Sequence, residues 1–358
     1  MNTLINIRTI ILLLPSFILS AACSEPAKQN KNTTTTVAVT EPALPKEHFK
    51  RSEVIPSVFL KNDPAQNFAL YLPKSYSDAV KLPVIVFFDP HGDGTVPLNL
   101  YHELAEKYNY ILVASNDSKN GLSFDETNMI AANLVKECKT RFSVDEKKIA
   151  FCGFSGGAKV ALMSGATNED VSAIIYCGAA AQVKANHLVS LLGFAGKKDM
   201  NYTDLVSFEW SMEKAPMKHY LIEWNGKHEF PTADVFNDAF IFLSTGDVEQ
   251  YSRKKVTITL EKVNEEQMIK QKYIEAFNTK DLDWWKAEIN SLNTKKKMNP
   301  MYERLTGFIS LACYSITDRA FQQNNLGGIE KVLAIYKMDD PENKAWKDFS
   351  AELQKRKK

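Results

Sequence analysis

The chain has 358 residues, and its 44 lysines and arginines nearly balance its 43 aspartates and glutamates, which leaves a formal net charge of +1. A protein that neutralises nucleic-acid phosphates usually has a strong basic excess, so this balance argues against nucleic-acid binding. Apolar residues form 44% of the chain, which supports a full buried core and excludes a mostly disordered protein. The length suits one large domain together with a smaller one.

Residues 1–22 have the composition of a signal peptide. Arg8 supplies positive charge ahead of an apolar stretch, residues 10–19, which is too short to span a bilayer as a helix. Small residues at positions 20–22 then provide a cleavage site for a signal peptidase. The sequence therefore predicts export.

Cys23 directly follows the predicted cleavage site. A cysteine at this position resembles the lipobox of bacterial lipoproteins, in which the thiol is lipidated and the cysteine becomes the mature N-terminus. The resemblance implies a lipoprotein anchored at Cys23 to a membrane of a bacterial envelope. Ser20 departs from the lipobox, which has a large aliphatic residue at that position. Cleavage at the same bond also fits ordinary secretion into the periplasm or the medium.

Residues 23–50 form a polar segment that is rich in Thr, Lys, Asn and Pro. It includes a run of threonines at positions 33–36. Such a segment cannot bury enough apolar surface to fold. It is therefore predicted to be a flexible tether between the membrane and the folded part of the chain.

Four cysteines remain beyond Cys23, namely Cys138, Cys152, Cys177 and Cys313. An exported protein can pair such cysteines in disulfides. The apolar neighbours of Cys152 and Cys177 suit buried free thiols equally well, so the disulfide state stays open. The sequence contains no CxxC pair and no Cys/His cluster, and no metal site is predicted.

Residues 51–246 alternate between strand-like and helix-like patterns. Strands are predicted at 58–60, 68–72, 82–88, 110–114, 148–152, 171–177, 189–194 and 219–224. Helices are predicted between them at 98–108, 124–142, 157–164, 203–214 and 233–243. Continuous apolar runs such as 82–88 indicate strands that are buried on both faces. The alternation predicts an α/β fold with a doubly wound, mostly parallel sheet.

Residues 247–358 are expected to form a small all-α C-terminal region, because the pattern is helical and Lys-rich from about residue 263 onward. The segment 325–343 resembles one tetratricopeptide repeat, and a single repeat is not stable alone. The region is therefore expected to pack its large apolar residues on the sheet domain. These residues are Trp284, Trp285, Phe308, Leu311, Ile316, Phe321, Leu333 and Tyr336. A further role of these helices, in binding a protein partner or framing a substrate entrance, stays open.

Residues 153–157 read Gly-Phe-Ser-Gly-Gly and fit the pattern G-x-S-x-G, with a predicted strand before them and a predicted helix after them. In this context Ser155 lies on a tight strand-to-helix turn. Over residues 68–243 the sequence resembles the α/β-hydrolase superfamily, and more closely its small secreted esterases of the dienelactone-hydrolase-like and polyhydroxybutyrate-depolymerase-like types. The resemblance implies that Ser155 is a nucleophile. The alternative is a glycine-rich turn without chemistry.

The resemblance implies partners in the chain order Ser, acid, His. His228 follows the last predicted strand, whereas His187 precedes a strand and His219 lies in one, so His228 is the predicted base. Asp199 follows the strand at 189–194 and is the predicted acid, with Asp204 as the second choice. The alternatives are a surface histidine for His228, and a helix cap or a partner of a neighbouring lysine for Asp199.

A serine nucleophile also needs hydrogen-bond donors for the oxyanion of the tetrahedral intermediate. One is predicted to be the backbone N–H of Gly156, directly after the nucleophile. The other is expected from the loop 89–94, which resembles the His-Gly oxyanion loop of the superfamily, with Gly92 and Asp93 as the candidates. No cofactor is expected.

The predicted function is hydrolysis of carboxylic esters. Only about a dozen residues separate the strands at 171–177 and 189–194, too few for a cap domain. An open site suits bulky esters such as acylated polysaccharides. A peptidase on the same fold and a lipid-anchored binding protein without activity are the alternatives.

Overall fold

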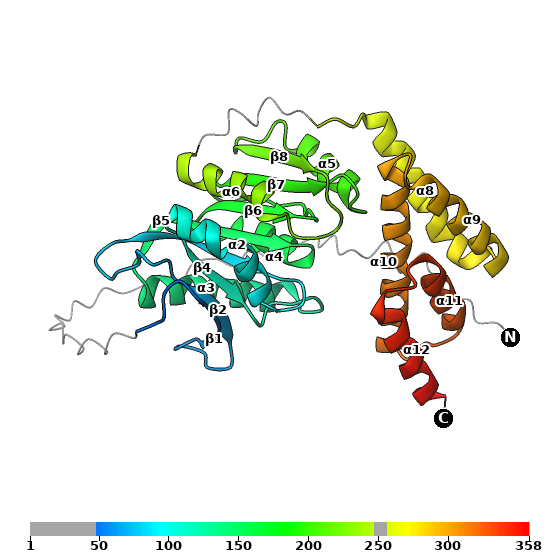
Figure 1. Ribbon diagram of the computed structural model, residues 1–358, viewed down its shortest axis with the longest axis horizontal. Helices are drawn as coiled ribbons and strands as arrows, with labels where there is room; N and C mark the ends of the chain where they lie inside the picture. The colour runs from blue at the N-terminus through cyan, green and yellow to red at the C-terminus, as the bar shows by residue number, and fades with distance from the viewer. Residues whose placement is uncertain (1–47, 247–255, 358) are drawn as a thin grey trace, which may run out of the picture.

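A computed structural model describes residues 48–246 and 256–357 of the chain. The described residues form a sheet flanked by helices and, beside it, a group of helices from the C-terminal part of the chain (Figure 1). The predicted signal peptide, Cys23 and most of the predicted tether lie outside the described residues. Within the described residues, no helix is both long enough and apolar enough to cross a membrane.

The centre of the structure is an eight-stranded sheet with the strand order β1-β2-β4-β3-β5-β6-β7-β8. The strands are β1 (Val54–Phe59), β2 (Asn67–Tyr71), β3 (Leu82–Phe88), β4 (Ile111–Ser115), β5 (Val144–Phe154), β6 (Val171–Cys177), β7 (Ser190–Gly196) and β8 (His219–Trp224). β2 pairs antiparallel with both β1 and β4, and all other neighbours are parallel. This arrangement is an α/β-hydrolase fold followed by a helical C-terminal region, which confirms the predicted fold class.

Helices cover both faces of the sheet. Those of the sheet domain are α2 (Thr95–Tyr108), α3 (Phe124–Arg141), α4 (Gly156–Gly165), α5 (Tyr202–Ser211) and α6 (Ala233–Thr245). Successive residues of a strand point to opposite faces. Ile85 and Phe87 therefore pack in one core with residues of α2 and α6, whereas Val84 and Val86 pack in the other with residues of α3, α4 and α5. This double burial explains why β3 is an unbroken apolar run.

One strand is longer than its sequence pattern predicts. β5 begins at Val144, although only residues 148–152 have a clear strand pattern. Val144 pairs with Leu82, and the register between β3 and β5 then shifts before Val84 pairs with Ile149. The charged residues 145–148 lie within this irregular stretch, which hides the start of the strand from a sequence reading.

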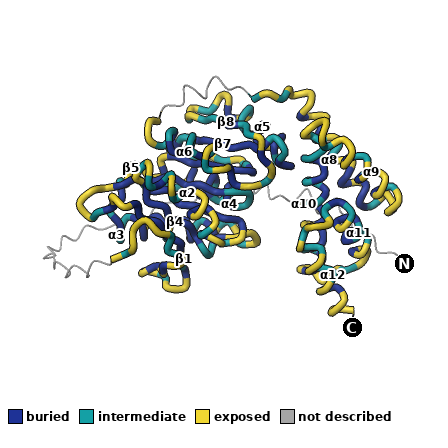
Figure 2. Tube along the Cα trace, in the orientation of Figure 1, coloured by how far each residue is buried: buried dark blue, intermediate teal, exposed yellow. Residues whose placement is uncertain are grey.

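The C-terminal helices have a hydrophobic core of their own. They are α8 (Leu260–Thr279), α9 (Leu282–Lys295), α10 (Pro300–Gln322), α11 (Ile329–Asp339) and α12 (Lys344–Arg356). Trp285, Ile316, Phe321, Leu333 and Tyr336 are buried together in that core. Figure 2 shows the buried positions facing one another inside the group of helices.

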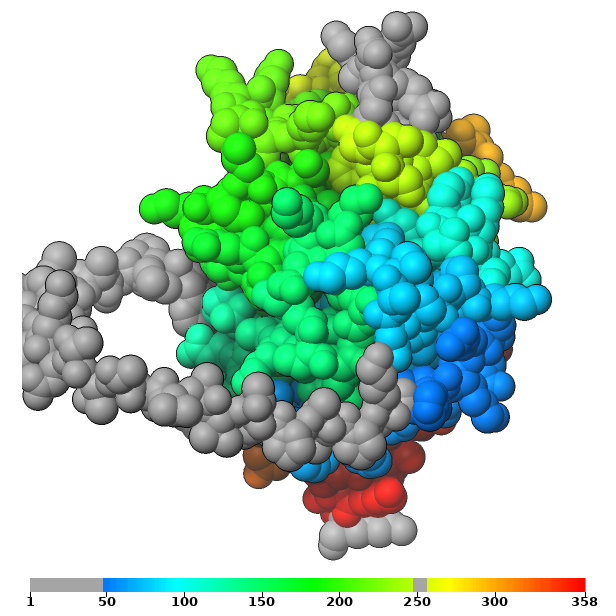
Figure 3. Space-filling view, turned by 90° about the vertical axis from the view of Figure 1, so that its left-hand side faces the viewer, coloured from blue at the N-terminus to red at the C-terminus, as the bar shows by residue number. Residues whose placement is uncertain are grey.

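This arrangement differs from the expectation that these side chains bury against the sheet domain. Five helices are enough to bury them mutually, and Leu311 stays exposed. Viewed from the side away from α8–α12, the surface consists mainly of sheet-domain residues, and the C-terminal helices show only at the margin (Figure 3). The resemblance of residues 325–343 to a tetratricopeptide repeat stays a prediction.

The four cysteines of the described residues are free, buried thiols. Cys152 and Cys177 lie on the neighbouring strands β5 and β6, inside the core shared with α2 and α6. Burial raises the pKa of the Cys138 thiol to about 12, which makes it a poor nucleophile. The sequence left disulfides and free thiols as alternatives, and in the structure these four cysteines are free thiols.

A buried carboxyl group in the C-terminal core makes stability depend on pH. Burial raises the pKa of Asp339, on α11, from 3.8 to about 8, and its Oδ1 atom has no hydrogen-bond partner among the described residues. The unfolded chain therefore loses a proton near pH 4 that the folded protein keeps until about pH 8. Between these values the unfolded state binds fewer protons, so stability falls as pH rises.

Asp339→Asn should remove this contribution, because the amide has no proton to lose. We expect the melting temperature of the variant to exceed that of the wild type by roughly 10 °C at pH 8 and to match it near pH 4. Thermal unfolding followed by circular dichroism across this range measures the difference. An unchanged difference from pH 4 to pH 8 would show that Asp339 ionises normally in the folded chain.

Candidate active site

Ser155 lies on the turn between β5 and α4, with φ 52° and ψ −118°. This backbone conformation is strained for a residue with a side chain. The turn packs so closely that a Cβ atom on Gly153 would lie 2.1 Å from the Gly157 oxygen, and one on Gly157 would lie 1.9 Å from the Phe88 oxygen. The Ser155 N–H donates to the Cys177 oxygen at 2.9 Å. Close packing at the two glycines and the hydrogen bond to the neighbouring strand thus hold Ser155 in this conformation at the strand-to-helix turn.

His228 comes from the loop between β8 and α6. Its Nε2 atom lies 2.9 Å from the Ser155 Oγ atom. The side chain is 22% exposed, and its ring packs on the Phe154 ring with centroids 4.7 Å apart. The packing restricts the plane of the imidazole ring, while part of the side chain stays exposed at the surface.

Asp199 follows β7 and is only 1% exposed. Each of its carboxylate oxygens lies 3.0 Å from the His228 Nδ1 atom, and Oδ1 also accepts the Asn201 N–H at 2.8 Å. An ionised carboxylate can only accept hydrogen bonds, so the proton of the neutral imidazole belongs on Nδ1. Nε2 is then free to accept the hydroxyl proton of Ser155. The geometry makes the serine a potential nucleophile with its base already in contact.

The structure brings together the three residues predicted for the site and separates the other candidates from it. Asp204, the second choice for the acid, accepts a hydrogen bond from Gln267 at 2.7 Å. His219 bonds to Glu209 at 3.0 Å, and His187 bonds to the Val171 oxygen at 2.8 Å. Each of these side chains has a structural partner outside the Ser155 cluster.

The predicted oxyanion loop is arranged differently from the expectation. The Gly92 N–H donates to the Asp89 backbone oxygen at 3.2 Å, and the Asp93 N–H donates to the Asp89 side chain at 3.3 Å. Both amides are thus used within the loop. Gly156, by contrast, is the first residue of α4, where a backbone N–H has no acceptor inside the helix.

Asn120 is a residue of this site that sequence analysis missed. A Cβ atom on Gly156 would lie 1.8 Å from the Asn120 Oδ1 atom, so the side-chain amide of Asn120 rests against the backbone that follows the nucleophile. The Asn120 N–H also donates to the Pro90 oxygen at 2.8 Å, which ties its loop to the loop after β3. Asn120 lies in a short polar loop without a periodic pattern, so only the folded geometry reveals its position.

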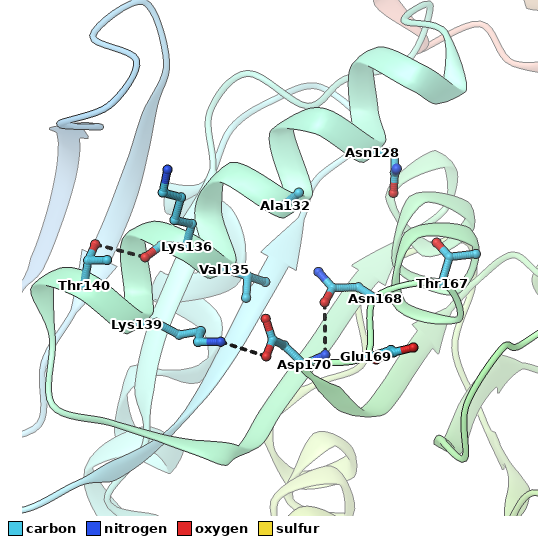
Figure 4. Close-up of a pocket in the computed structure, with 10 residues that line it drawn as sticks. All are labelled: Asn128, Ala132, Val135, Lys136, Lys139, Thr140, Thr167, Asn168, Glu169 and Asp170. Atoms are coloured by element: carbon cyan, nitrogen blue, oxygen red, sulfur yellow. Dashed lines mark hydrogen bonds and ion pairs between the residues drawn. The ribbon is translucent and has the colours of Figure 1, made fainter. Parts of the chain in front are cut away.

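A hollow of about 480 Å³ lies away from this site (Figure 4). It lies between the C-terminal half of α3 and the turn that follows α4, near the amino ends of β5 and β6. Lys139 in its wall is paired with Asp170 at 2.8 Å and with Glu146 at 3.2 Å. Ligands of open α/β sheets bind at the carboxyl ends of the strands, where Ser155, Asp199 and His228 lie.

No protein-family model and no curated protein matches the chain. Solved structures similar to part of it include a hyperthermophilic esterase from Pyrobaculum calidifontis, with 12% identity, 55% of this chain and 87% of that one covered, and a TM-score of 0.45. The S-formylglutathione hydrolase FrmB from Staphylococcus aureus has 14% identity, with 54% and 99% covered and a TM-score of 0.45. An esterase from Thermogutta terrifontis has 17% identity, with 51% and 87% covered and a TM-score of 0.40. Identities this low leave the activity to be argued from the residues of this chain.

Replacing Asp199 with asparagine should suppress the reactivity of Ser155. An amide in place of the carboxylate favours the wrong tautomer of His228, and we expect the reaction with a fluorophosphonate probe to slow by about 10³- to 10⁴-fold. Asp204→Asn is the matched control, because it changes the neighbouring carboxylate without touching His228, and it should label within about twofold of wild type. Pseudo-first-order labelling rates measure both variants, and the reverse ranking would assign the acid to Asp204.

Proposed function

We propose that this chain is an exported serine hydrolase that cleaves carboxylic esters through an acyl-enzyme. The observation that supports the proposal is the continuous pair of hydrogen bonds from Ser155 through His228 to Asp199, at 2.9 Å and 3.0 Å. A structural histidine in a surface loop has no need of a strained serine on one side and a buried carboxylate on the other. The combination is what a serine nucleophile requires for activation.

In the proposed reaction, the Ser155 Oγ atom attacks the ester carbonyl carbon while His228 Nε2 takes the hydroxyl proton. Asp199 stabilises the imidazolium that results. Collapse of the tetrahedral intermediate breaks the bond to the alcohol oxygen, and His228 returns the proton to that oxygen. A water molecule then attacks the acyl-serine with His228 as the base, which releases the carboxylic acid and restores Ser155.

The oxyanion of both tetrahedral intermediates needs hydrogen-bond donors. We assign the Gly156 N–H as one of them, because it starts α4 beside the nucleophile. For the second donor we favour the side-chain amide of Asn120, which touches Gly156, over the N–H groups of Gly92 and Asp93, which already donate to Asp89. The amide nitrogen and oxygen of an asparagine can exchange places by rotation, so either orientation is accessible.

The substrate class that we propose is a bulky ester, such as an acyl group on a polysaccharide. Residues 178–189, between β6 and β7, contain no helix or strand that would form a cap over the site. His228 keeps an exposed edge. A site with these properties accommodates an ester whose alcohol part extends away from the enzyme.

Ser155→Ala should abolish ester hydrolysis while the fold stays intact. Without the nucleophile only slow residual catalysis remains, so kcat for p-nitrophenyl acetate should fall by at least about 10⁴-fold. Ser172→Ala is the control, because its hydroxyl bonds to the Ile149 oxygen at the other end of the sheet. If wild type neither hydrolyses esters nor reacts with a fluorophosphonate, the chain is a binding protein on this fold.

We further propose that the protein is held at a bacterial membrane through a lipid on Cys23. The support is the position of this cysteine directly after a predicted cleavage site. Cys23→Ser should move the protein from the membrane fraction to the soluble fraction, which fractionation and immunoblotting of cells measure. A wild-type protein found in the soluble periplasm or the medium would contradict the anchor and leave ordinary secretion.

A further inference from the structure

The loop that carries Asp199 is held by helices from the C-terminal region. This acid loop, residues 197–201, follows β7 and leads into α5. Figure 1 shows α8 and α10 beside the end of the sheet where α5 lies. The C-terminal helices bury most of their large apolar residues in a core of their own, and Val263 on α8 joins the core of the sheet domain.

The centre of this contact is a buried cluster of three charged side chains, Glu266 and Lys270 on α8 and Arg304 on α10, each at most 5% exposed. Arg304 binds Glu266 through Nε at 3.0 Å and through Nη2 at 2.6 Å. Lys270 lies 3.3 Å from the same carboxylate. Removing charges from water is costly, so two cations around one buried carboxylate need additional acceptors.

The acid loop supplies those acceptors. Arg304 Nη1 donates to the Lys197 oxygen at 2.6 Å, and Lys270 Nζ donates to the Met200 oxygen at 2.6 Å. These two carbonyls flank Asp199 in the sequence, one on each side. Arg304 also lies over the ring of Tyr202, 4.8 Å from its centroid. The backbone on both sides of the proposed acid is therefore fixed from the C-terminal helices.

Helix α10, which carries Arg304, also reaches the loop that carries His228. Glu303 on α10 pairs with Lys227 at 3.0 Å. The acid loop itself contacts that loop, because the Lys198 N–H donates to the Gly226 oxygen at 2.9 Å. Arg304, through Lys197 and its neighbours, thus acts on the relative position of the two loops whose side chains form the hydrogen bond between Asp199 and His228.

We propose that Arg304, supported by Glu266 and Lys270, is a positioning residue of the active site, and that the C-terminal helices set the distance between Asp199 and His228. This inference rests on the proposed function. Arg304 does not touch the substrate, and it acts through the acid loop. A small displacement of a catalytic group from its productive position costs a large factor in rate, which makes such a clamp effective.

Arg304→Met should lower kcat for p-nitrophenyl acetate by about 10- to 100-fold, with KM changed less than about twofold, because the acid is displaced while the surface that binds the ester is not. Arg356→Met is the matched control. Arg356 also pairs with a glutamate, Glu352, and donates to a backbone oxygen, that of Phe321, but it lies on α12, away from the acid loop. Its removal should leave kcat within about twofold of wild type.

A double-mutant cycle separates positioning from a general loss of stability. If Arg304 acts through Asp199, Arg304→Met should lower kcat/KM by less than about twofold in an Asp199→Asn background, because the group that it positions no longer works. Arg304→Met leaves the buried Glu266 carboxylate without Arg304, and this single variant can fail to fold. In that case the double variant Glu266→Met with Arg304→Met, which removes both charges of the buried pair, is measured instead. All rates are measured at least about 20 °C below the melting temperature of each variant, so that nearly all of the protein is folded during the assay.

An equal loss of kcat/KM in the wild-type and Asp199→Asn backgrounds would overturn the proposal, and so would an unchanged kcat in Arg304→Met. Either result leaves the proposed function standing as long as Ser155→Ala is inactive. A fully active Ser155→Ala would instead overturn the proposed function itself. The two failures are therefore distinguishable.

Discussion

The close approach of the turn after β5 to the end of β3 is the constraint on which the rest of the site depends. Neither Gly153 nor Gly157 has room for a side chain, because backbone oxygens fill the space where a Cβ atom would lie. The chain passes from strand to helix here through a residue with positive φ, and that residue is Ser155. The fold therefore holds Ser155 in an unfavourable backbone conformation. The packing of the surrounding core supplies the stability that keeps the residue there.

A parallel sheet then brings the other two residues to the same edge. β5, β7 and β8 run in one direction, so the loops that follow them all leave the sheet at its carboxyl end. Ser155, Asp199 and His228 are far apart in the chain but come from these three loops. Their chain order and their positions directly after β5, β7 and β8 are consequences of topology, and for this reason sequence analysis could select them before any distance was known.

Other parts of the site depend on contacts that no local pattern encodes. The strand runs and the glycines around Ser155 are visible in the sequence because each reflects burial or backbone geometry at its own position. The Gly92 N–H is directed to the backbone oxygen of Asp89 and the Asp93 N–H to the Asp89 carboxylate, and the place of Asn120 depends on a loop 30 residues away. The contact between Arg304 and Lys197 joins residues that are 107 positions apart. Apolar patterns indicated that α8–α12 would be helical, but they did not indicate that these helices pack mainly among themselves and contact the acid loop through charged side chains.

The place of Arg304 late in the chain has a consequence for the biosynthesis of the protein. A ribosome completes the sheet, Ser155, Asp199 and His228 well before α10 emerges, and domains generally fold as they are synthesised, from the N-terminal side. If Arg304 positions the acid loop as we propose, the sheet domain can reach its fold before the contact between Asp199 and His228 is fixed. Under the proposed function, the newly made protein would then gain full activity only when its last helices have assembled.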